Sequence, residues 1–236
     1  MSSKSTDVWK KRWDGLEQML QADDNAAQDA HRYETLKSVR RCLAAFGHSH
    51  YDFFKSGFEG DNGISLEPSP DYPKEYVLST ILQQISFDLD VIGRAGHYRL
   101  PTALRDARET LDKADILAYT ALKPAIKANL LPDMTVVTYF QKSVSVHIMP
   151  YAPVALIGIP FSAIDNPCDL LAIPHEVGHY VYRHGIFQDQ AHKGSRFEAV
   201  LRNQLAGRPQ WLLNWVEEIF ADRAYLDDGS LVPRSR

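Results

Sequence analysis

The sequence predicts an α+β protein in which a mostly helical N-terminal region precedes a small β-sheet and two site-bearing helices. Three observations lead to this prediction. Apolar residues recur at helical spacing through most of residues 7–122, β-branched and aromatic residues alternate from residue 135, and helical spacing returns after about residue 166. With 44% hydrophobic residues among 236, the chain can bury a sizeable core.

The N-terminal region reads as a series of helices. Leu36, Val39 and Leu43 illustrate the apolar spacing of one helical face. Three glycines and three prolines between residues 56 and 73 exclude a regular element there. The expected elements are two helices within residues 7–55 separated near 23–25, a loop over 56–73, and helices over 75–92 and 101–122, the last broken or kinked at Pro124.

The β-rich segment reads as three strands. Alternation over residues 135–140 and 143–149 predicts a hairpin. A third run, residues 154–159, lies between Pro153 and Pro160. Because proline cannot donate a ladder hydrogen bond, we expect this third strand at an edge of the sheet. A histidine-bearing helix comes next. Two further helices follow it, over residues 197–205 and 210–227.

These elements divide the chain into three expected segments. Residues 1–130 form a helical region that makes one wall of a cleft or controls access to it, and residues 131–228 form the site-bearing domain. The last eight residues, 229–236, resemble a protease-cleavage linker of the kind added to recombinant proteins, with a native polar tail as the alternative.

Composition excludes several functional classes. A net charge of −4 and the lack of a long basic run argue against a nucleic-acid partner. No stretch of about 18 apolar residues predicts a membrane span, and no N-terminal apolar segment predicts a signal peptide, so we expect a cytoplasmic protein. Cys42 and Cys168 form no CxxC pair and are expected to be reduced thiols.

The segment His175-Glu176-Val177-Gly178-His179 carries the strongest chemical signal. On a helix, residues four apart share a face, so both imidazoles can reach one metal ion with Glu176 beside them. Catalytic zinc takes three protein ligands and keeps one position open for water. The two histidines therefore predict a zinc site that lacks one ligand.

A later helix supplies that ligand. Glu218 and Asp222 are four residues apart and share a face. Glu218 can reach the metal while Asp222 accepts the second N–H group of a ligand histidine and orients its ring. Glu217 is out of phase with Asp222 in this pattern. One helix is thus predicted to provide both the ligand and its support.

HExxH followed by ExxxD resembles the gluzincin branch of the zincin metallopeptidases, over about residues 135–228. The 39 positions from His179 to Glu218 suit that pattern. The resemblance implies a zincin-like sheet, one zinc ion held by His175, His179 and Glu218, and Glu176 as general base in peptide-bond hydrolysis.

The resemblance also implies where a substrate lies and what is missing. An extended peptide would pair with the expected edge strand, at Ala155, Leu156, Ile157 and Gly158. The residue that stabilises the oxyanion is unassigned. Its candidates, each with a packing or surface role as the alternative, are Tyr180, Tyr182, His184, His192 and Tyr225.

Other readings stay open. The fold can serve as an interaction or regulatory module with structural zinc and no turnover, and the same ligands permit an amidohydrolase that acts on a non-peptide substrate. The N-terminal helical region can also receive an activating protein or ligand. The plainest alternative is that His175 and His179 are surface histidines of an ordinary helix and Glu218 is a solvated acid.

Overall fold

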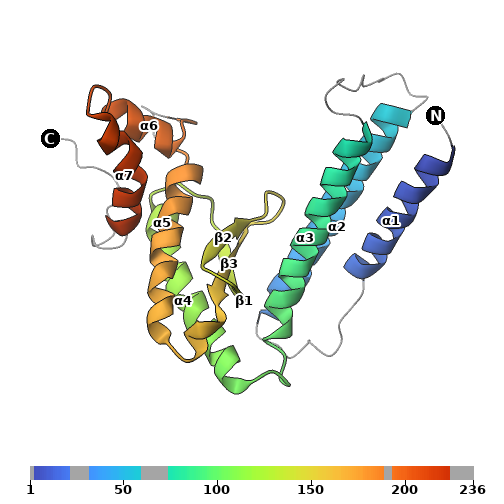
Figure 1. Ribbon diagram of the computed structural model, residues 1–236, viewed down its shortest axis with the longest axis horizontal. Coiled ribbons are helices and arrows are strands. Elements are labelled where there is room, and N and C mark those ends of the chain that lie inside the picture. Colours follow the sequence, from blue (N-terminus) through green and yellow to red (C-terminus); the bar gives the residue numbers. More distant parts are fainter. Residues whose placement is uncertain (1–2, 22–31, 60–73, 189–192, 224–236) are drawn as a thin grey trace. The chain divides into compact units, whose positions relative to one another are not determined.

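The computed structural model, shown in Figure 1, describes residues 3–21, 32–59, 74–188 and 193–223. The chain forms two compact units, Met1–Pro101 and Thr102–Arg236. The division therefore lies before the fourth helix rather than near residue 130, and this helix belongs with the sheet. The fold is mostly helical with one small mixed sheet, so the α+β class is confirmed.

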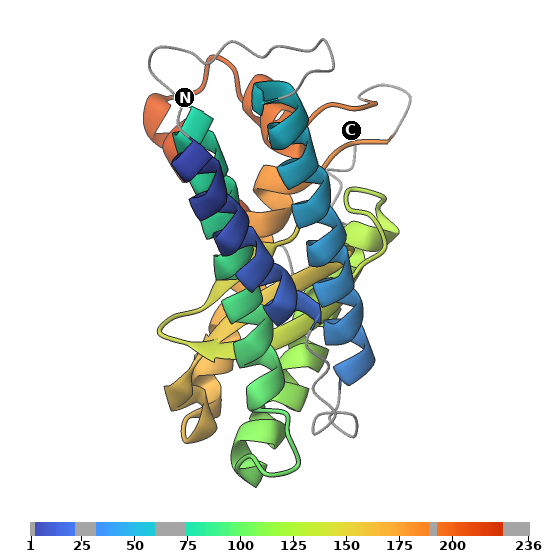
Figure 2. The same cartoon turned by 90° about the vertical axis from the view of Figure 1, so that its right-hand side faces the viewer.

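The first unit contains the helices α1 (Ser3–Gln21), α2 (Tyr33–Glu59) and α3 (Lys74–His97), which run alongside one another in Figure 2. Their shared core holds Trp13, Leu43 and Ile85, and Leu43 lies on the helical face that the apolar spacing predicts. The prediction of a loop from residue 56 is wrong at its start, because α2 continues to Glu59. Residues 23–25 and 60–73 lie outside the described part of the chain.

The second unit is built on a sheet of three strands, β1 (Thr135–Gln141), β2 (Ser145–Ile148) and β3 (Val154–Pro160), in the order β1-β3-β2. β3 runs parallel to β1 and antiparallel to β2. The predicted hairpin is wrong, because β1 and β2 both pair with β3 and not with each other.

The predicted edge position of residues 154–159 is also wrong, so Ala155, Leu156, Ile157 and Gly158 lie in the central strand. The prolines stand where they disturb no ladder: Pro153 precedes the strand and accepts a hydrogen bond from Thr135, and Pro160 is its last residue. A continuous apolar run is typical of a strand that is covered on both faces. β3 is buried from Val154 through Ile159, as a central strand requires.

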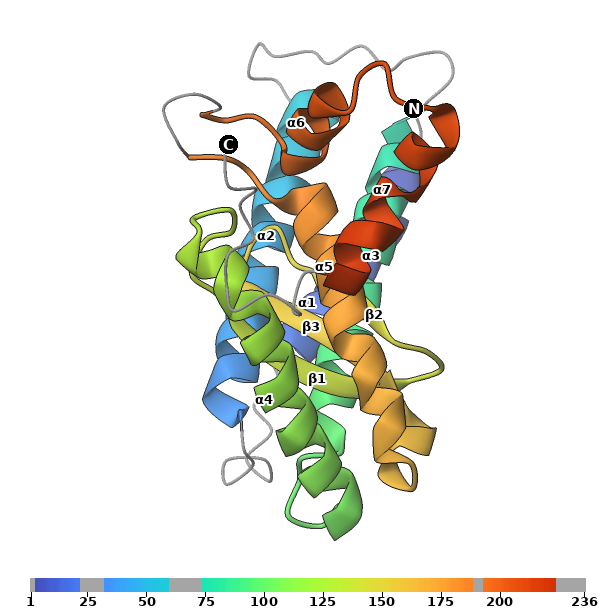
Figure 3. The ribbon, with the colours of Figure 1, turned by 90° about the vertical axis from the view of Figure 1, so that its left-hand side faces the viewer.

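Two helices cover one face of the sheet, as Figure 3 shows: α4 (Arg105–Lys127) packs on β1, and α5 (Ala172–His184) contacts both α4 and β2. A buried polar link joins α4 to β1. The carboxylate of Asp115 accepts hydrogen bonds from the backbone N–H and the hydroxyl of Thr138, both at 2.7 Å. Because both residues are buried, this link fixes how α4 lies on the strand.

The bounds of α4 differ from the prediction at both ends. Pro101 lies in a turn and the helix begins at Arg105, while its C-terminal end passes through Pro124 to Lys127. Proline removes one helical N–H group, but Ala128 still donates to the Pro124 carbonyl at 2.9 Å, so the last turn closes.

The chain reaches the remaining helices through two short 3-10 turns, η2 (Phe161–Ile164) and η3 (Pro167–Leu171), before α5. α6 (Phe197–Gln204) and α7 (Gln210–Arg223) follow, with α6 matching its prediction within one residue. Among the described helices, none is both long enough and apolar enough to cross a membrane.

Candidate metal centre

The helix α5 carries both candidate histidines. It begins at Ala172, so Pro174 lies in the first turn, where a missing N–H group breaks no helical hydrogen bond. The proline is therefore compatible with the helix that carries both histidines. His175 and His179 follow one turn apart, and their ring centroids are 4.6 Å apart.

A close helix crossing brings α7 to this face of α5. A Cβ atom at Gly178 would lie only 2.6 Å from the Cα atom of Ala221 and 3.0 Å from its carbonyl oxygen. Gly178 therefore lets the two backbones approach more closely than any side chain would allow. Glu217, Glu218 and Asp222 all lie within about one turn of Ala221. This contact therefore sets where their side chains lie along α5 relative to the histidines.

Three side-chain atoms converge at this crossing. The Nε2 atoms of His175 and His179 are 3.0 Å apart, and the Glu218 Oε2 atom lies 3.6 Å from the first and 3.4 Å from the second. An ion about 2.1 Å from each of three tetrahedral ligands holds those ligands about 3.4 Å apart. The three distances lie on both sides of that value, so the residues can hold one metal ion together.

Each histidine is held at its other ring nitrogen by a carboxylate of α7. His175 Nδ1 lies 2.9 Å from Asp222 Oδ1, and His179 Nδ1 lies 2.8 Å from Glu217 Oε1. A carboxylate acceptor favours the tautomer with hydrogen on Nδ1, which leaves Nε2 as the acceptor for a metal. Both rings are therefore aimed with the correct nitrogen toward Glu218.

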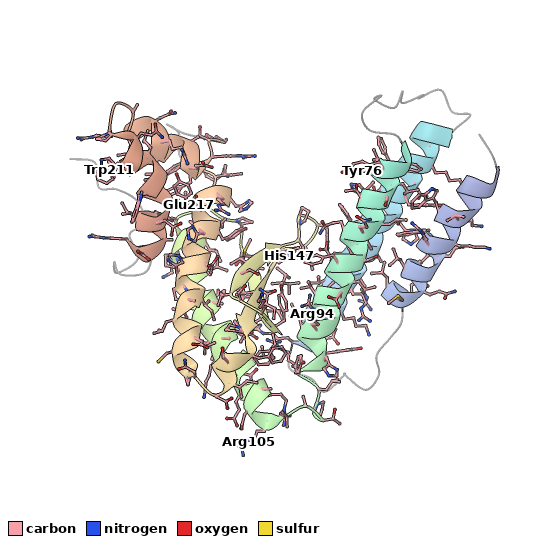
Figure 4. The ribbon with its side chains drawn as sticks, viewed as in Figure 1. Tyr76, Arg94, Arg105, His147, Trp211 and Glu217 are labelled. Atoms are coloured by element: carbon pink, nitrogen blue, oxygen red, sulfur yellow. The ribbon has the colours of Figure 1, made fainter. Side chains whose placement is uncertain are left out.

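The role of Glu217 was missed in the sequence, where only Asp222 stood in phase with Glu218. Two candidate ligand histidines leave two Nδ1 groups to satisfy. An acid next to the candidate ligand Glu218 was the signal that could have identified the second acceptor. Figure 4 marks Glu217 where α7 meets α5. The Arg183 guanidinium, 2.7 Å from the same Glu217 oxygen, also holds this carboxylate.

The two histidine–carboxylate pairs differ in exposure. The His179 and Glu217 side chains are 15% and 19% exposed, whereas those of His175 and Asp222 are 30% and 71% exposed. Water screens an exposed hydrogen-bonded pair more than a buried one. Glu217 therefore holds its histidine more firmly than Asp222 does.

Glu176 lies beside the cluster on α5 and is half-buried. Its neighbour His175 is a candidate ligand, so the carboxylate is one residue from the centre. Among the described residues, none forms a hydrogen bond or an ion pair with Glu176. This carboxylate is the only acid of α5. Unlike Glu217 and Asp222, it forms no hydrogen bond with a histidine among the described residues.

The candidate oxyanion residues have other surroundings. Tyr180 is buried and stacks on His184, and this burial raises the pKa of its hydroxyl. Tyr182 is fully buried, with its ring 6.0 Å from that of Phe220. These contacts indicate packing roles for both tyrosines. His192 and Tyr225 lie outside the described residues.

No protein-family model matches the chain, and neither a curated protein nor a solved structure matches it. What defines the site is therefore its own geometry. Two imidazoles and one carboxylate could form a three-ligand set, and such a donor set suits zinc.

Proposed function

We propose that this protein is a zinc-dependent hydrolase that cleaves peptide bonds. The observation that carries the proposal is the orientation of the two histidines: each directs Nε2 toward Glu218 while a separate carboxylate accepts at Nδ1. Surface histidines on an ordinary helix have no reason to share both features. Three protein ligands also match the number that leaves a catalytic zinc one open position.

The roles of the residues follow from their places. A zinc ion, when bound, makes its water acidic enough to ionise near neutral pH and polarises a carbonyl group. Glu176 is the available base: its carboxylate accepts the proton of the attacking water and returns it to the leaving amine. Glu217 and Asp222 keep the two imidazoles in position throughout.

An extended peptide is the favoured substrate because the sheet keeps one outer strand open. The outer side of β1 is occupied at Thr138, whose N–H group donates to Asp115 of α4. On the other side, the described part of the second unit has no strand beyond β2 (Ser145–Ile148), and β2 packs against α5. A peptide can pair with β2 through main-chain hydrogen bonds, in place of the strand expected from the sequence.

The test combines metal analysis with cleavage of an unfolded protein such as reduced, alkylated casein. We expect one zinc ion per chain and a rate that falls about 10²- to 10⁴-fold in Glu176→Gln, with zinc retained. Glu109→Gln is the matched control, since Glu109 is an exposed acid of α4 that pairs only with Arg105 among the described residues. Its rate should equal that of the wild type.

Each alternative has its own outcome. One bound zinc without cleavage of casein or of small acyl amides indicates an interaction module with structural zinc. Hydrolysis of small amides but not of casein indicates an amidohydrolase with a non-peptide substrate. Absence of zinc at stoichiometric level overturns the metal centre itself.

A further inference from the structure

The helices of the first unit line a cavity that opens to solvent and is unrelated to the metal centre. It has a volume of about 480 Å³ and is lined by one face each of α2 and α3 and by the end of α1. Successive turns of α2 contribute Tyr33, Leu36, Arg40 and Ala44, at the spacing of a single helical face. A cavity of this size is in the range of small-molecule sites.

The inner wall of the cavity is apolar. Leu20, Leu36 and Ile92 come from three different helices, and all three are buried. Such a wall favours the hydrocarbon part of a ligand, because burying apolar surface is the main source of affinity in a preformed pocket.

The charged residues of the described lining are all basic. Lys37, Arg40 and Arg41 lie on neighbouring turns of α2, and none of the described lining residues is acidic. The whole chain has a net charge of −4, so this concentration of positive charge runs against the overall balance. The Lys37 ammonium lies 3.4 Å from the Tyr33 hydroxyl, which helps to hold it on this face. A negatively charged group is the ligand chemistry that such a lining favours.

Two glycines keep the α3 side of the cavity open. A Cβ atom at Gly93 would meet nothing within 4 Å, and one at Gly96 would meet only the Leu36 Cδ1 atom, at 3.7 Å. Close helix packing therefore does not require either glycine. A glycine inside a helix is about 1 kcal/mol less favourable than alanine. Both glycines belong to the lining, so the absence of a side chain at each position leaves the cavity open.

We propose that this cavity binds a small organic anion with an apolar body and a carboxylate or phosphate head group. The hydrocarbon part contacts Leu20, Leu36 and Ile92, and the head group meets Arg40 and its neighbouring cations. This site is distinct from the proposed hydrolytic centre, which lies in the other unit.

The test uses isothermal titration calorimetry of the full chain with octanoate, octyl phosphate and 1-octanol, all below micelle formation. We expect one saturable site for octanoate, octyl phosphate or both, and at least tenfold weaker binding of 1-octanol. The comparison of the two anions distinguishes a carboxylate from a phosphate ligand. Equal affinity for 1-octanol, or no saturable binding of either anion, overturns the proposal.

Two variants separate the wall from the head-group contacts. Gly93→Leu fills the cavity and should reduce anion affinity at least tenfold while the melting temperature stays equal or rises, because leucine favours the helix. Arg40→Met keeps an apolar stem and should weaken anions at least fivefold without changing 1-octanol binding. Arg12→Gln removes an exposed α1 cation outside the cavity and should bind like the wild type.

The outcomes of these variants are decisive. If Gly93→Leu remains folded by circular dichroism and binds anions as the wild type does, the cavity is not the site. If Gly93→Leu fails to fold, Arg40→Met and Arg12→Gln still decide. Equal loss of anion affinity in Arg40→Met and Arg12→Gln would show that binding depends only on the net charge of the protein, which would overturn the proposal.

Discussion

Gly178 of α5 lies directly against Ala221 of α7, so close that a Cβ atom on the glycine would come within 2.6 Å of the alanine Cα atom. The opposing atom belongs to the backbone, which a rotamer change cannot move away. The middle of the HEVGH segment thus decides how near the glutamate-bearing helix comes to the histidines.

Replacing Gly178 with alanine should separate α5 from α7. We expect a loss of about 1–3 kcal/mol in the free energy of unfolding, and zinc affinity at least tenfold weaker because Glu218 moves away from the histidines. Chemical denaturation and zinc competition with a chelating dye measure the two effects. Gly15→Ala is the control: a Cβ atom there meets nothing within 4 Å, so stability should stay equal or rise and zinc affinity should not change.

Glu217→Ala should weaken zinc binding about 10- to 100-fold, because His179 loses the carboxylate that orients its ring. Asp222→Ala should have a smaller effect, since that carboxylate is 71% exposed and Glu217 only 19%. Dye competition on both variants gives the ranking. A larger loss in Asp222→Ala would contradict the importance assigned to burial.

Zinc should hold α7 on α5, since the three candidate ligands come from both helices. At a free zinc concentration about 100 times the dissociation constant, the added stability is about 2.7 kcal/mol. Hydrogen exchange should therefore slow in peptides covering Gln210–Arg223 when zinc is added, and a chelator should reverse it. In Glu218→Gln the protection should largely disappear. Equal protection in this variant would show that Glu218 is not a ligand.

Breaking the link between α4 and β1 should destabilise the second unit. Asp115→Ala leaves the buried N–H group of Thr138 without its acceptor, at a cost of about 1–3 kcal/mol. Thr138→Val keeps that N–H bond and loses only the hydroxyl contacts, so its loss should be about 1 kcal/mol. Urea denaturation measures both. An equal effect of the two substitutions would argue against the backbone bond as the main contribution.

His184 should make stability depend on pH. Burial, followed by the charges of Arg183 and Arg196, lowers its pKa below the ordinary 6.5. The unfolded chain then binds the proton more readily, so this contribution is present above pH 6.5 and is lost as the pH falls through the folded-state pKa. Melting temperatures between pH 7.5 and 5 should fall less in Arg196→Gln, where one opposing charge is removed. A steeper fall in that variant would contradict the assigned cause.

Much of the local structure could be predicted from the sequence. The helices around Leu43, Ile85 and Phe197 follow from apolar spacing, because a helix that packs on one side repeats its buried face every 3.6 residues. Pairing in the sheet could not be predicted in the same way. Alternation shows that residues 135–149 form strands, but it does not say which strand each one joins. β3 takes the central place in the sheet, and its residues from Val154 through Ile159 are buried on both faces.

By itself, the sequence determined which residues can meet on one helix face: His175 with His179, and Glu218 with Asp222. Only the tertiary structure decided how these two faces meet. It placed Glu217 opposite His179, because the crossing at Gly178 sets the rotation and the height of α7. Helical periodicity fixes directions around one axis, whereas the distance between two axes depends on the atoms that touch where they cross.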